Sequence, residues 1–351
     1  MIPLSTVVAL RRDPGLPAQW GHQSGLAEEP YGTRLGHVDH HRLAGFAPAD
    51  ERDDAVVARP GVLHHAVVTR DLHRSERYRE GETALVWPTI LAMPRWPVAM
   101  VTGASSGIGR AIAVRLAAEG SALVLVARRG DILETLADEL RTTSHAPVEV
   151  LVADLTDAVE LARVEERLRA DPPVDLLVNN AGLGAQGRFA EIGLEWQERQ
   201  ILLNVLAPVR LTHVALEGML SRKRGGVLNV SSIAGIQPLP NVATYAATKA
   251  YLSSFSHSLH EEVRPSGVAV TALLPGFTRT EFHDTAGMSR SIVPGAAWMS
   301  ADVVAAAGLR AVARGRAQCV PGLGYRVLSG ISRVTPWSLS RRVVGSIMAR
   351  G

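Results

Sequence analysis

The sequence predicts an α/β protein built on a doubly wound parallel sheet of about seven strands, with an irregular N-terminal extension. From Trp96 onward, short runs rich in Val, Leu and Ala alternate with longer amphipathic stretches, which is typical of repeated strand–helix units. Some of these runs are unbroken, as in residues 123–126, and such strands are typical of parallel sheets covered on both faces. The content of 46% apolar and 20% charged residues is that of a globular protein.

The predicted elements follow one another in a regular order. Short apolar runs predict the strands, and the amphipathic stretches between them predict helices. Because crossovers between parallel strands are right-handed, successive helices cover both faces of the sheet. The expected strands are 98–102, 122–127, 148–152, 175–179, 227–231 and 268–274, with a weaker one at 318–321.

Two flanking segments differ in composition from this core. Residues 1–95 carry 11 arginines, 12 acidic residues and seven of the 12 histidines, without a sustained helical or strand period. We expect them to be a disordered or non-native extension, since a start at Met93 would leave enough chain for the first strand. Residues 96–322 are the expected folded domain. Residues 323–351 are expected to form a basic amphipathic tail, because residues 303–351 hold eight arginines and no acidic residue.

Composition excludes several classes of protein. Cys319 is the single cysteine, so an internal disulfide and a cysteine-based zinc cluster are impossible, and the cytoplasm is the expected compartment. Lys223 and Lys249 are the only lysines, so the isoelectric point of about 9.3 reflects arginine usage and is poor evidence for nucleic-acid binding. The N-terminus lacks the pattern of a signal peptide, and no stretch is apolar enough to predict a membrane span.

Histidines do not predict a metal site. His37, His40 and His41 lie close together in the sequence, but in a segment where no predicted element would fix their geometry. We expect no metal.

A glycine-rich turn closes the first predicted strand. Residues 102–109 read TGASSGIG and lead into an amphipathic run. Glycines allow a sharp turn that brings backbone N–H groups to a pyrophosphate at a helix N-terminus, where the helix dipole favours negative charge. The candidate contacts to a dinucleotide in this turn are Gly103, Ser105, Ser106, Gly107, Ile108 and Gly109.

Tyr245 and Lys249 form a second candidate pair. On a helix, residues four apart share a face, so the ammonium group can lower the pKa of the phenol from about 10 toward neutrality. A compact charge that must reach both a phenol and a ribose also explains a lysine in a chain that otherwise uses arginine. An amphipathic surface pair is the alternative interpretation.

Other polar residues follow predicted strands. Ser232 comes after the fifth strand and 13 residues before Tyr245, Asn180 comes after the fourth strand, and Asp154 after the third. The carboxyl ends of parallel strands meet at one edge of the sheet, where ligands bind in a crevice. Each residue alone is compatible with an ordinary turn or cap, but all fall at the same edge.

These motifs, in this order, resemble the short-chain dehydrogenase/reductase family in its basic, single-domain form, over about Pro97 to Pro321. The resemblance implies a Rossmann fold and hydride transfer between a nicotinamide and an alcohol or carbonyl carbon. It implies that Tyr245 is the catalytic acid/base, Lys249 adjusts its pKa and anchors the ribose, and Ser232 holds the substrate oxygen. Asn204 would position a water in a proton relay.

The same resemblance implies the remaining cofactor contacts. Asp154 would bind the adenine, and the loop after the sixth strand would meet the nicotinamide, with Thr280 at its carboxamide. The implied residues are Asp154, Leu155, Asn180, Ala181, Gly182, Tyr245, Lys249, Pro275, Gly276, Thr278 and Thr280.

The end of the second strand predicts a preference for NADP over NAD. An NAD-binding fold carries an acidic residue there, which would repel a 2′-phosphate, whereas this strand is followed by Arg128 and Arg129. In the family's pattern Arg128 meets the phosphate, and Ser105 can add a hydroxyl. Ser106 departs from this pattern, since many NADP-preferring relatives have a basic residue there. Alternatively, the two arginines form the solvent-exposed start of a helix and bind no phosphate.

The substrate and the partners are less defined. Residues 182–191, 236–243 and 281–298 are expected to form loops over the crevice, and their apolar residues favour a lipophilic alcohol or carbonyl. A catalytically silent dinucleotide-binding sensor or scaffold is the alternative function; the intact set of Asn204, Ser232, Tyr245 and Lys249 favours an enzyme. The basic tail predicts a peripheral contact with an anionic membrane, a homo-oligomer contact, or a surface helix on the sheet edge.

Overall fold

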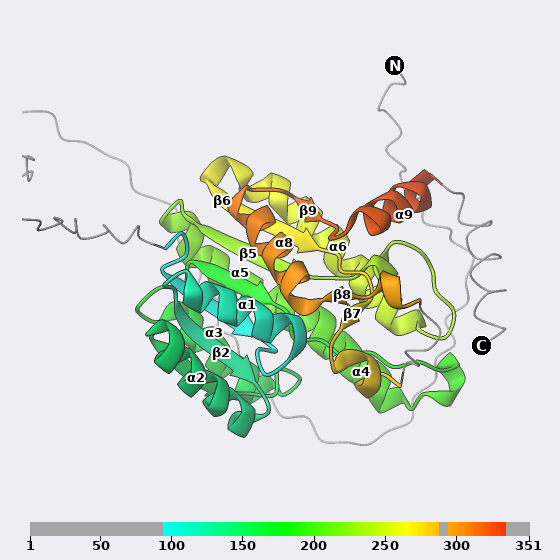
Figure 1. Cartoon of the computed structure of the whole chain (residues 1–351), viewed down its shortest axis with the longest axis horizontal. Coiled ribbons are helices and arrows are strands. Elements are labelled where there is room, and N and C mark those ends of the chain that lie inside the picture. Colours follow the sequence, from blue (N-terminus) through cyan, green and yellow to red (C-terminus); the bar gives the residue numbers. More distant parts are fainter. Residues whose placement is uncertain (1–93, 288–293, 335–351) are drawn as a thin grey trace, which may run out of the picture. The chain divides into compact units, whose positions relative to one another are not determined.

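A computed structural model of the chain describes residues 94–287 and 294–334. They contain a seven-stranded parallel sheet in the order β3-β2-β1-β4-β5-β6-β9, which confirms the predicted doubly wound fold (Figure 1). Residues 1–93, which form most of the predicted extension, lie outside the described part. The strands are β1 (Val98–Thr102), β2 (Ala122–Ala127), β3 (Val148–Val152), β4 (Leu176–Asn179), β5 (Gly225–Val230), β6 (Val268–Leu273) and β9 (Gln318–Cys319).

Helices connect the strands, as the amphipathic stretches predict. Between α4 and α5 the helix widens into a π-helical stretch at Leu202–Leu206, and β7 (Thr278–Arg279) pairs with β8 (Met299–Ser300) in a second, two-stranded sheet. The helices are α1 (Gly107–Ala118), α2 (Gly130–Ser144), α3 (Ala158–Arg169), α4 (Leu194–Ile201), α5 (Ala207–Ser221), α6 (Ala243–Val263), α7 (Phe282–Thr285), α8 (Ala301–Ala313) and α9 (Leu323–Val334).

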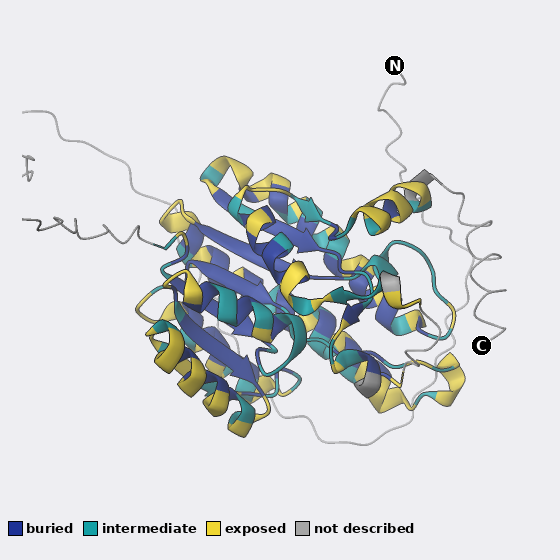
Figure 2. Cartoon of the chain, in the orientation of Figure 1, coloured by how far each residue is buried: buried dark blue, intermediate teal, exposed yellow. Residues whose placement is uncertain are grey.

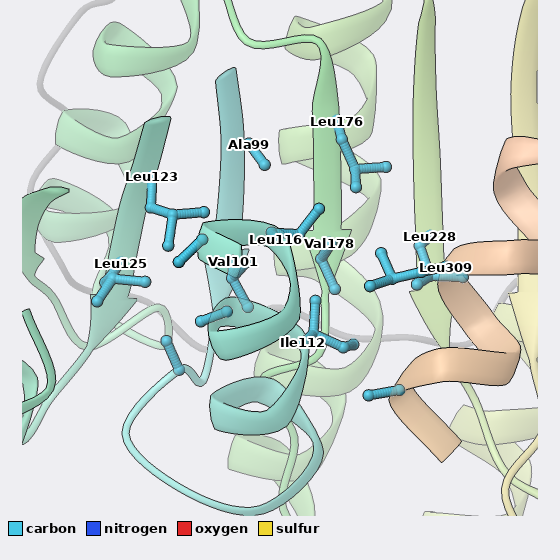
Figure 3. Packing of buried hydrophobic residues seen from close by; sticks show 14 of the residues in the cluster. Ala99, Val101, Ile112, Leu116, Leu123, Leu125, Leu176, Val178, Leu228 and Leu309 are labelled. Atoms are coloured by element: carbon cyan, nitrogen blue, oxygen red, sulfur yellow. The ribbon is translucent and has the colours of Figure 1, made fainter. Parts of the chain in front are cut away.

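The sheet has a hydrophobic layer on each face. Successive side chains of β1 point to opposite faces: Ala99 and Val101 pack in the layer of α1, α2 and α8, whereas Met100 packs in the layer of α3 and α5. Figure 3 shows Ile112 and Leu116 of α1 against the sheet. The central strands β1, β4 and β5 are buried throughout, whereas the edge strand β3 is partly exposed (Figure 2). Burying each such side chain stabilises the fold by about 1.5–3 kcal/mol.

A buried polar network joins the middle strands to two helices. The Asn179 side chain donates to Asn229 Oδ1 (2.8 Å) and to Thr212 Oγ1 of α5 (3.0 Å). The Asn229 amide donates in turn to Ser256 Oγ of α6 (2.9 Å). Buried polar groups are costly unless paired, so this network holds α5 and α6 at defined positions. Helix α6 carries Tyr245 and Lys249, and the network therefore helps to position the candidate site.

Strand β5 begins two residues earlier than predicted. Glycines disfavour strands, which is why the sequence pattern places the start at 227. A Cβ on Gly226 would lie 2.7 Å from the Trp96 ring, and one on Gly225, at φ +157°, would lie 2.4 Å from Met219. Close packing therefore requires glycine at both positions.

One helical stretch of the described residues is long and apolar enough for a membrane span, Leu194–Ser221. Its α5 part packs against the sheet through Leu211, Val214 and Met219, as expected of a core helix. The first part of the predicted amphipathic tail is α9, whereas residues 335–351 lie outside the described chain.

Candidate active site

A cleft of about 1130 Å³ lies at the carboxyl ends of the parallel strands. Its lining runs from the glycine turn after β1, past the ends of β2, β3 and β4, to Ser232, Tyr245 and Lys249. Every cofactor contact predicted from the sequence lines this cleft except Gly109. Residues distant in sequence thus come together at one edge of the sheet.

Gly109 lies behind the glycine turn and not on the cleft. A Cβ on this residue would be 2.3 Å from the Gly103 carbonyl oxygen and 2.4 Å from Asn180 Nδ2. The Asn180 amide itself donates to the carbonyl oxygens of Thr102 (2.9 Å) and Gly103 (3.1 Å). Gly109 therefore lets the helix approach the turn, and its contact with a dinucleotide stays a prediction.

The N-terminus of α1 fits a pyrophosphate. The helix begins at Gly107, and its N-cap residue Ser106 makes no side-chain hydrogen bond to the first turn. The first turn also carries no acidic residue. Its N–H groups at the cleft, together with the helix dipole, thus favour an anion, and the residues present fit a dinucleotide.

Ser232 and Tyr245 are hydrogen-bonded to each other at the inner end of the cleft. Ser232 Oγ accepts from the backbone N–H of Ala234 (3.1 Å), which leaves its own proton free to be donated. Burial raises the pKa of Tyr245 to about 12, and the hydrogen bond from Ser232 acts in the opposite direction. The sequence-based expectation of a lowered tyrosine pKa is therefore not met in this structure.

Lys249 lies beside the tyrosine but does not offset its burial. Its Nζ is 5.8 Å from the centre of the Tyr245 ring and donates to the Val230 carbonyl oxygen (2.9 Å). Burial lowers the pKa of Lys249 to about 8. The lysine residue is only 4% exposed, and this desolvation disfavours its charged form.

Asn204 is buried in the π-helical stretch before α5. Its amide donates to the Leu183 carbonyl oxygen (2.8 Å) and to Thr248 Oγ1 (3.1 Å), and its Oδ1 accepts from the Leu183 N–H (3.0 Å). Asn204 does not line the cleft, but its Oδ1 lies beside Gly182, as does the Nζ of Lys249. π-Helical turns often occur at functional sites. Here the turn holds the asparagine between the end of β4 and α6.

The two arginines after β2 point to different partners. Arg128 lies with Nη1 3.7 Å from Asp154 Oδ2, while Arg129 donates to Ser105 Oγ (3.0 Å) and to Glu281 Oε2 (3.0 Å). The Ser105 hydroxyl predicted to help bind a phosphate is therefore beside Arg129 and not Arg128. Adjacent residues at the end of a strand point to different sides, and the sequence alone does not decide which arginine has a given partner.

Asp154 is held as a carboxylate. Its Oδ1 accepts from the backbone N–H (3.0 Å) and hydroxyl (2.8 Å) of Thr156, and Oδ2 accepts from Arg199 of α4 (3.0 Å). The net effect of these bonds and of the Arg128 and Arg199 charges is to lower the pKa of Asp154, although partial burial, the largest single influence, acts to raise it. Arg199 was not predicted as part of the site, because its helix is distant in sequence.

The loop after β6 closes the other side of the cleft. Pro275, Gly276, Thr278 and Thr280, the predicted nicotinamide contacts, all line it. A Cβ on Gly107 would lie 2.9 Å from the Thr280 side chain, so this loop reaches the glycine turn. The glycine turn and the predicted nicotinamide loop are thus in close proximity.

Residues 97–290 match the family model described as short chain dehydrogenase, which covers more than half of the chain. The chain belongs to the short-chain dehydrogenase family. Membership confirms the fold and assigns the protein to the nicotinamide-dependent oxidoreductases.

Other short-chain dehydrogenases resemble this chain in sequence and structure. The uncharacterized oxidoreductase YvaG of Bacillus subtilis is 38% identical over 197 residues, which are 56% of this chain and 73% of that protein. A short-chain dehydrogenase from Sphingobium yanoikuyae, solved in complex with NADPH, is 38% identical with a TM-score of 0.63, covering 67% of this chain and 93% of that one. The bulky-bulky ketone specific alcohol dehydrogenase from Comamonas testosteroni is 32% identical with a TM-score of 0.60, covering 72% and 94%.

In this short-chain dehydrogenase, α9 forms part of the cleft, which the sequence did not indicate. Leu328, Ser329 and Ser332 line the cleft from α9. The Tyr325 hydroxyl donates to the Ala297 carbonyl oxygen (2.7 Å) and accepts from the Phe277 N–H (3.2 Å). The Gln237 side chain, from the opposite loop, donates to the Ser332 carbonyl oxygen. A basic amphipathic pattern predicts a surface helix, and only the tertiary contacts reveal its inner face.

Proposed function

We propose that the protein is an NADP-dependent oxidoreductase that transfers a hydride between a nicotinamide and an alcohol or carbonyl substrate, with Tyr245 as acid/base. The observation that carries this proposal is the Ser232 hydroxyl next to the buried phenol of Tyr245, both of which line the cleft. Lys249 and Asn204 lie beside it, and the cleft extends from there to an uncapped helix N-terminus. A silent sensor or scaffold would not require this reactive set.

The chain's own groups account for the proton transfer. Ser232 can donate its hydroxyl proton to the substrate oxygen and hold it next to the phenol. Tyr245 gives its proton to that oxygen in reduction and takes it back in oxidation. When bound, the nicotinamide supplies or accepts the hydride.

Lys249 has two roles in this proposal. Its charge would stabilise the phenolate that forms when Tyr245 loses its proton, and its Nζ, which lies beside Gly182, would anchor a ribose. Burial raises the pKa of Tyr245 and so disfavours the phenolate, which this charge would offset. Asn204 holds the backbone at Leu183 and leaves one lone pair of its Oδ1 for a water in the relay.

Substituting Tyr245 tests the proposal. Tyr245→Phe removes only the proton-transferring oxygen, so we expect turnover to fall about 10²- to 10⁴-fold while cofactor affinity stays nearly unchanged. Tyr251→Phe on the same helix is the control, because Tyr251 is exposed and stacks on Phe255. Turnover by Tyr245→Phe close to that of the control would contradict the assignment.

The proposed preference for NADP rests on the charge at the end of β2. Arg128 and Arg129 both line the cleft there, together with the Ser105 hydroxyl. A planar guanidinium binds a phosphate through two hydrogen bonds. We expect Arg128→Ala to weaken NADPH binding far more than NADH binding, as measured by titration calorimetry. An equal loss for both cofactors, or a higher kcat/KM of the wild-type protein with NADH, would refute this preference.

The proposed substrate is a lipophilic alcohol or carbonyl compound. Around Tyr245, the cleft is lined by Ile236, Leu239, Phe282 and Trp298, and the Phe282 ring centre lies 5.5 Å from that of Tyr245. The similar Comamonas testosteroni enzyme is described as specific for bulky-bulky ketones. A screen of NADPH oxidation with ketones, aldehydes, steroids and 3-oxoacyl esters tests this class. Higher kcat/KM for charged sugars than for every lipophilic compound would contradict it.

We further propose a cytoplasmic protein with a folded domain at 96–322 and a basic tail that contacts anionic lipid. Leu323, Val327 and Ile331 recur every four residues on α9, and each is more than half exposed (Figure 2). Residues 303–351 carry no acidic residue, so their charge complements an anionic surface. Co-sedimentation with phosphatidylserine vesicles should fall in Val327→Glu. An unchanged bound fraction would favour a homo-oligomer contact or a plain surface helix.

A further inference from the structure

A salt bridge crosses the mouth of the cofactor cleft. Arg129, after β2, donates Nη1 to Glu281 Oε2 at 3.0 Å, and Glu281 follows the loop of β6 on the other side. Arg129 also donates to Ser105 Oγ through Nε (3.3 Å) and Nη2 (3.0 Å). Ser105, Arg129 and Glu281 all line the cleft. The Glu281 carboxylate therefore pairs with the Arg129 guanidinium, which also contacts the Ser105 hydroxyl.

This arrangement is an anion site that is filled by the chain itself. A guanidinium fork next to a hydroxyl is suited to a phosphate monoester, which carries a charge of about −1.5 to −2 at pH 7 and three acceptor oxygens. The Glu281 carboxylate carries one charge and offers two oxygens. A phosphate entering this site would therefore displace Glu281 from Arg129, and the two anions would repel each other if both remained there.

We propose that Glu281 competes with the 2′-phosphate of NADPH for Arg129, and so reduces the margin by which the protein prefers NADPH over NADH. This inference rests on the proposed NADP-dependent function. NADH lacks the 2′-phosphate and leaves the Arg129–Glu281 pair in place. When NADPH binds, its 2′-phosphate replaces Glu281 as the partner of Arg129.

The exchange also links the two ends of the cleft. Glu281 lies between Thr280, which approaches the glycine turn at Gly107, and Phe282, whose ring faces Tyr245 at 5.5 Å between centres. Releasing Glu281 therefore frees the segment that carries Phe282 from its tie to the end of β2. The bound cofactor in this way alters the restraint on a loop that lines the substrate end of the cleft.

Glu281→Gln tests the competition because it keeps the shape of the side chain and removes its charge. We expect Glu281→Gln to tighten NADPH binding about two- to fivefold, the range of an exposed ion pair, and to leave NADH binding unchanged. Glu139→Gln is the matched control, since Glu139 pairs with Arg110 at 2.6 Å, is similarly exposed and does not line the cleft. Dissociation constants are measured by calorimetry on the full chain at fixed ionic strength.

The position of the effect is tested by a second substitution. In an Arg129→Lys background, which keeps the charge but loses the fork, Glu281→Gln should give a smaller gain in NADPH affinity than in the wild-type background. If Glu281→Gln shifts the affinity for both cofactors equally, or weakens NADPH binding, the competition does not occur. Equal affinities of the wild-type protein for NADPH and NADH would overturn the NADP preference itself and the inference with it. An NADPH-preferring wild type whose preference Glu281→Gln leaves unchanged would overturn the inference alone.

Discussion

At the residue scale, burial governs the two groups nearest the proposed chemistry. Burial raises the pKa of Tyr245 to about 12 and lowers that of Lys249 to about 8, so both groups resist ionisation in the folded protein. Spacing along a helix correctly indicated that the two side chains share a face. It gave no indication of their desolvation, which depends on how tightly the surrounding loops close.

The lowered pKa of Lys249 predicts a dependence of stability on pH. The unfolded chain, with an ordinary lysine pKa of 10.5, binds more protons than the folded chain between pH 8 and 10.5. Stability rises with pH wherever the unfolded state binds more protons, so Lys249 adds to the free energy of unfolding as pH rises through this window. The raised pKa of Tyr245 acts in the other direction only between about pH 10 and 12.

Urea unfolding at pH 8 and pH 9.5 measures this contribution. We expect the gain in unfolding free energy from pH 8 to pH 9.5 to be smaller in Lys249→Met than in Lys223→Met, which removes the other, exposed lysine. The comparison cancels other groups that titrate over the same range. Identical changes in the two variants would show that Lys249 titrates normally.

At the element scale, Tyr325 contributes two of the hydrogen bonds that attach α9 to the domain. The Tyr325 hydroxyl bonds to Ala297 and Phe277, which lie on either side of residues 288–293 in the sequence. Tyr325→Phe removes both hydrogen bonds and leaves the ring, so α9 should open locally at a lower free energy, by about 1–3 kcal/mol. Faster amide exchange in α9 but not in α8 would be observed by mass spectrometry. Unchanged exchange in α9 would mean that the ring and the hydrogen bond from Gln237 to Ser332 are enough to hold the helix.

The sequence predicted elements well where their signals are local. Strands such as 98–102 and 122–127 agree with the structure because continuous apolar runs are specific to a buried parallel sheet. The pairing of β7 with β8 was missed, since two-residue strands carry no pattern and exist only through a contact between Thr278 and Met299. The partner of Arg129, Glu281, lies 152 residues away and was equally beyond local reasoning.

At the scale of the whole molecule, the described residues cover the predicted domain at 96–322, apart from residues 288–293, and the start of the tail. The motifs were sufficient to identify the family and the edge of the sheet that carries the cleft, because carboxyl ends of parallel strands converge whatever the loops do. The inner wall supplied by α9 was not predictable, because its amphipathic pattern suits a surface helix equally well.

The N-terminal boundary makes a prediction for the whole chain. If residues 1–95 form no part of the folded domain, trypsin should cut first at the arginines of this segment, leaving a fragment that begins near Trp96. Trp96 itself is buried, so cleavage should not proceed far beyond it. Mass spectrometry of a digestion time course identifies the fragments. An N-terminal segment that stays uncut while the core is native would show that it is structured.

The contact between Gly276 and Tyr325 has a consequence for how the sequence can change. A Cβ on Gly276 would lie 2.3 Å from the Tyr325 ring, so the aromatic ring occupies the space that a side chain at 276 would need. Substitutions at the two positions are therefore coupled: Gly276→Ala should be harmful alone and tolerated once Tyr325 is replaced by a small residue. In a library that varies both positions, selection for folded protein should recover pairs in which a larger residue at 276 occurs with a smaller residue at 325. The change at 325 would have to come first for a lineage to pass from the present pair to such a pair through folded intermediates.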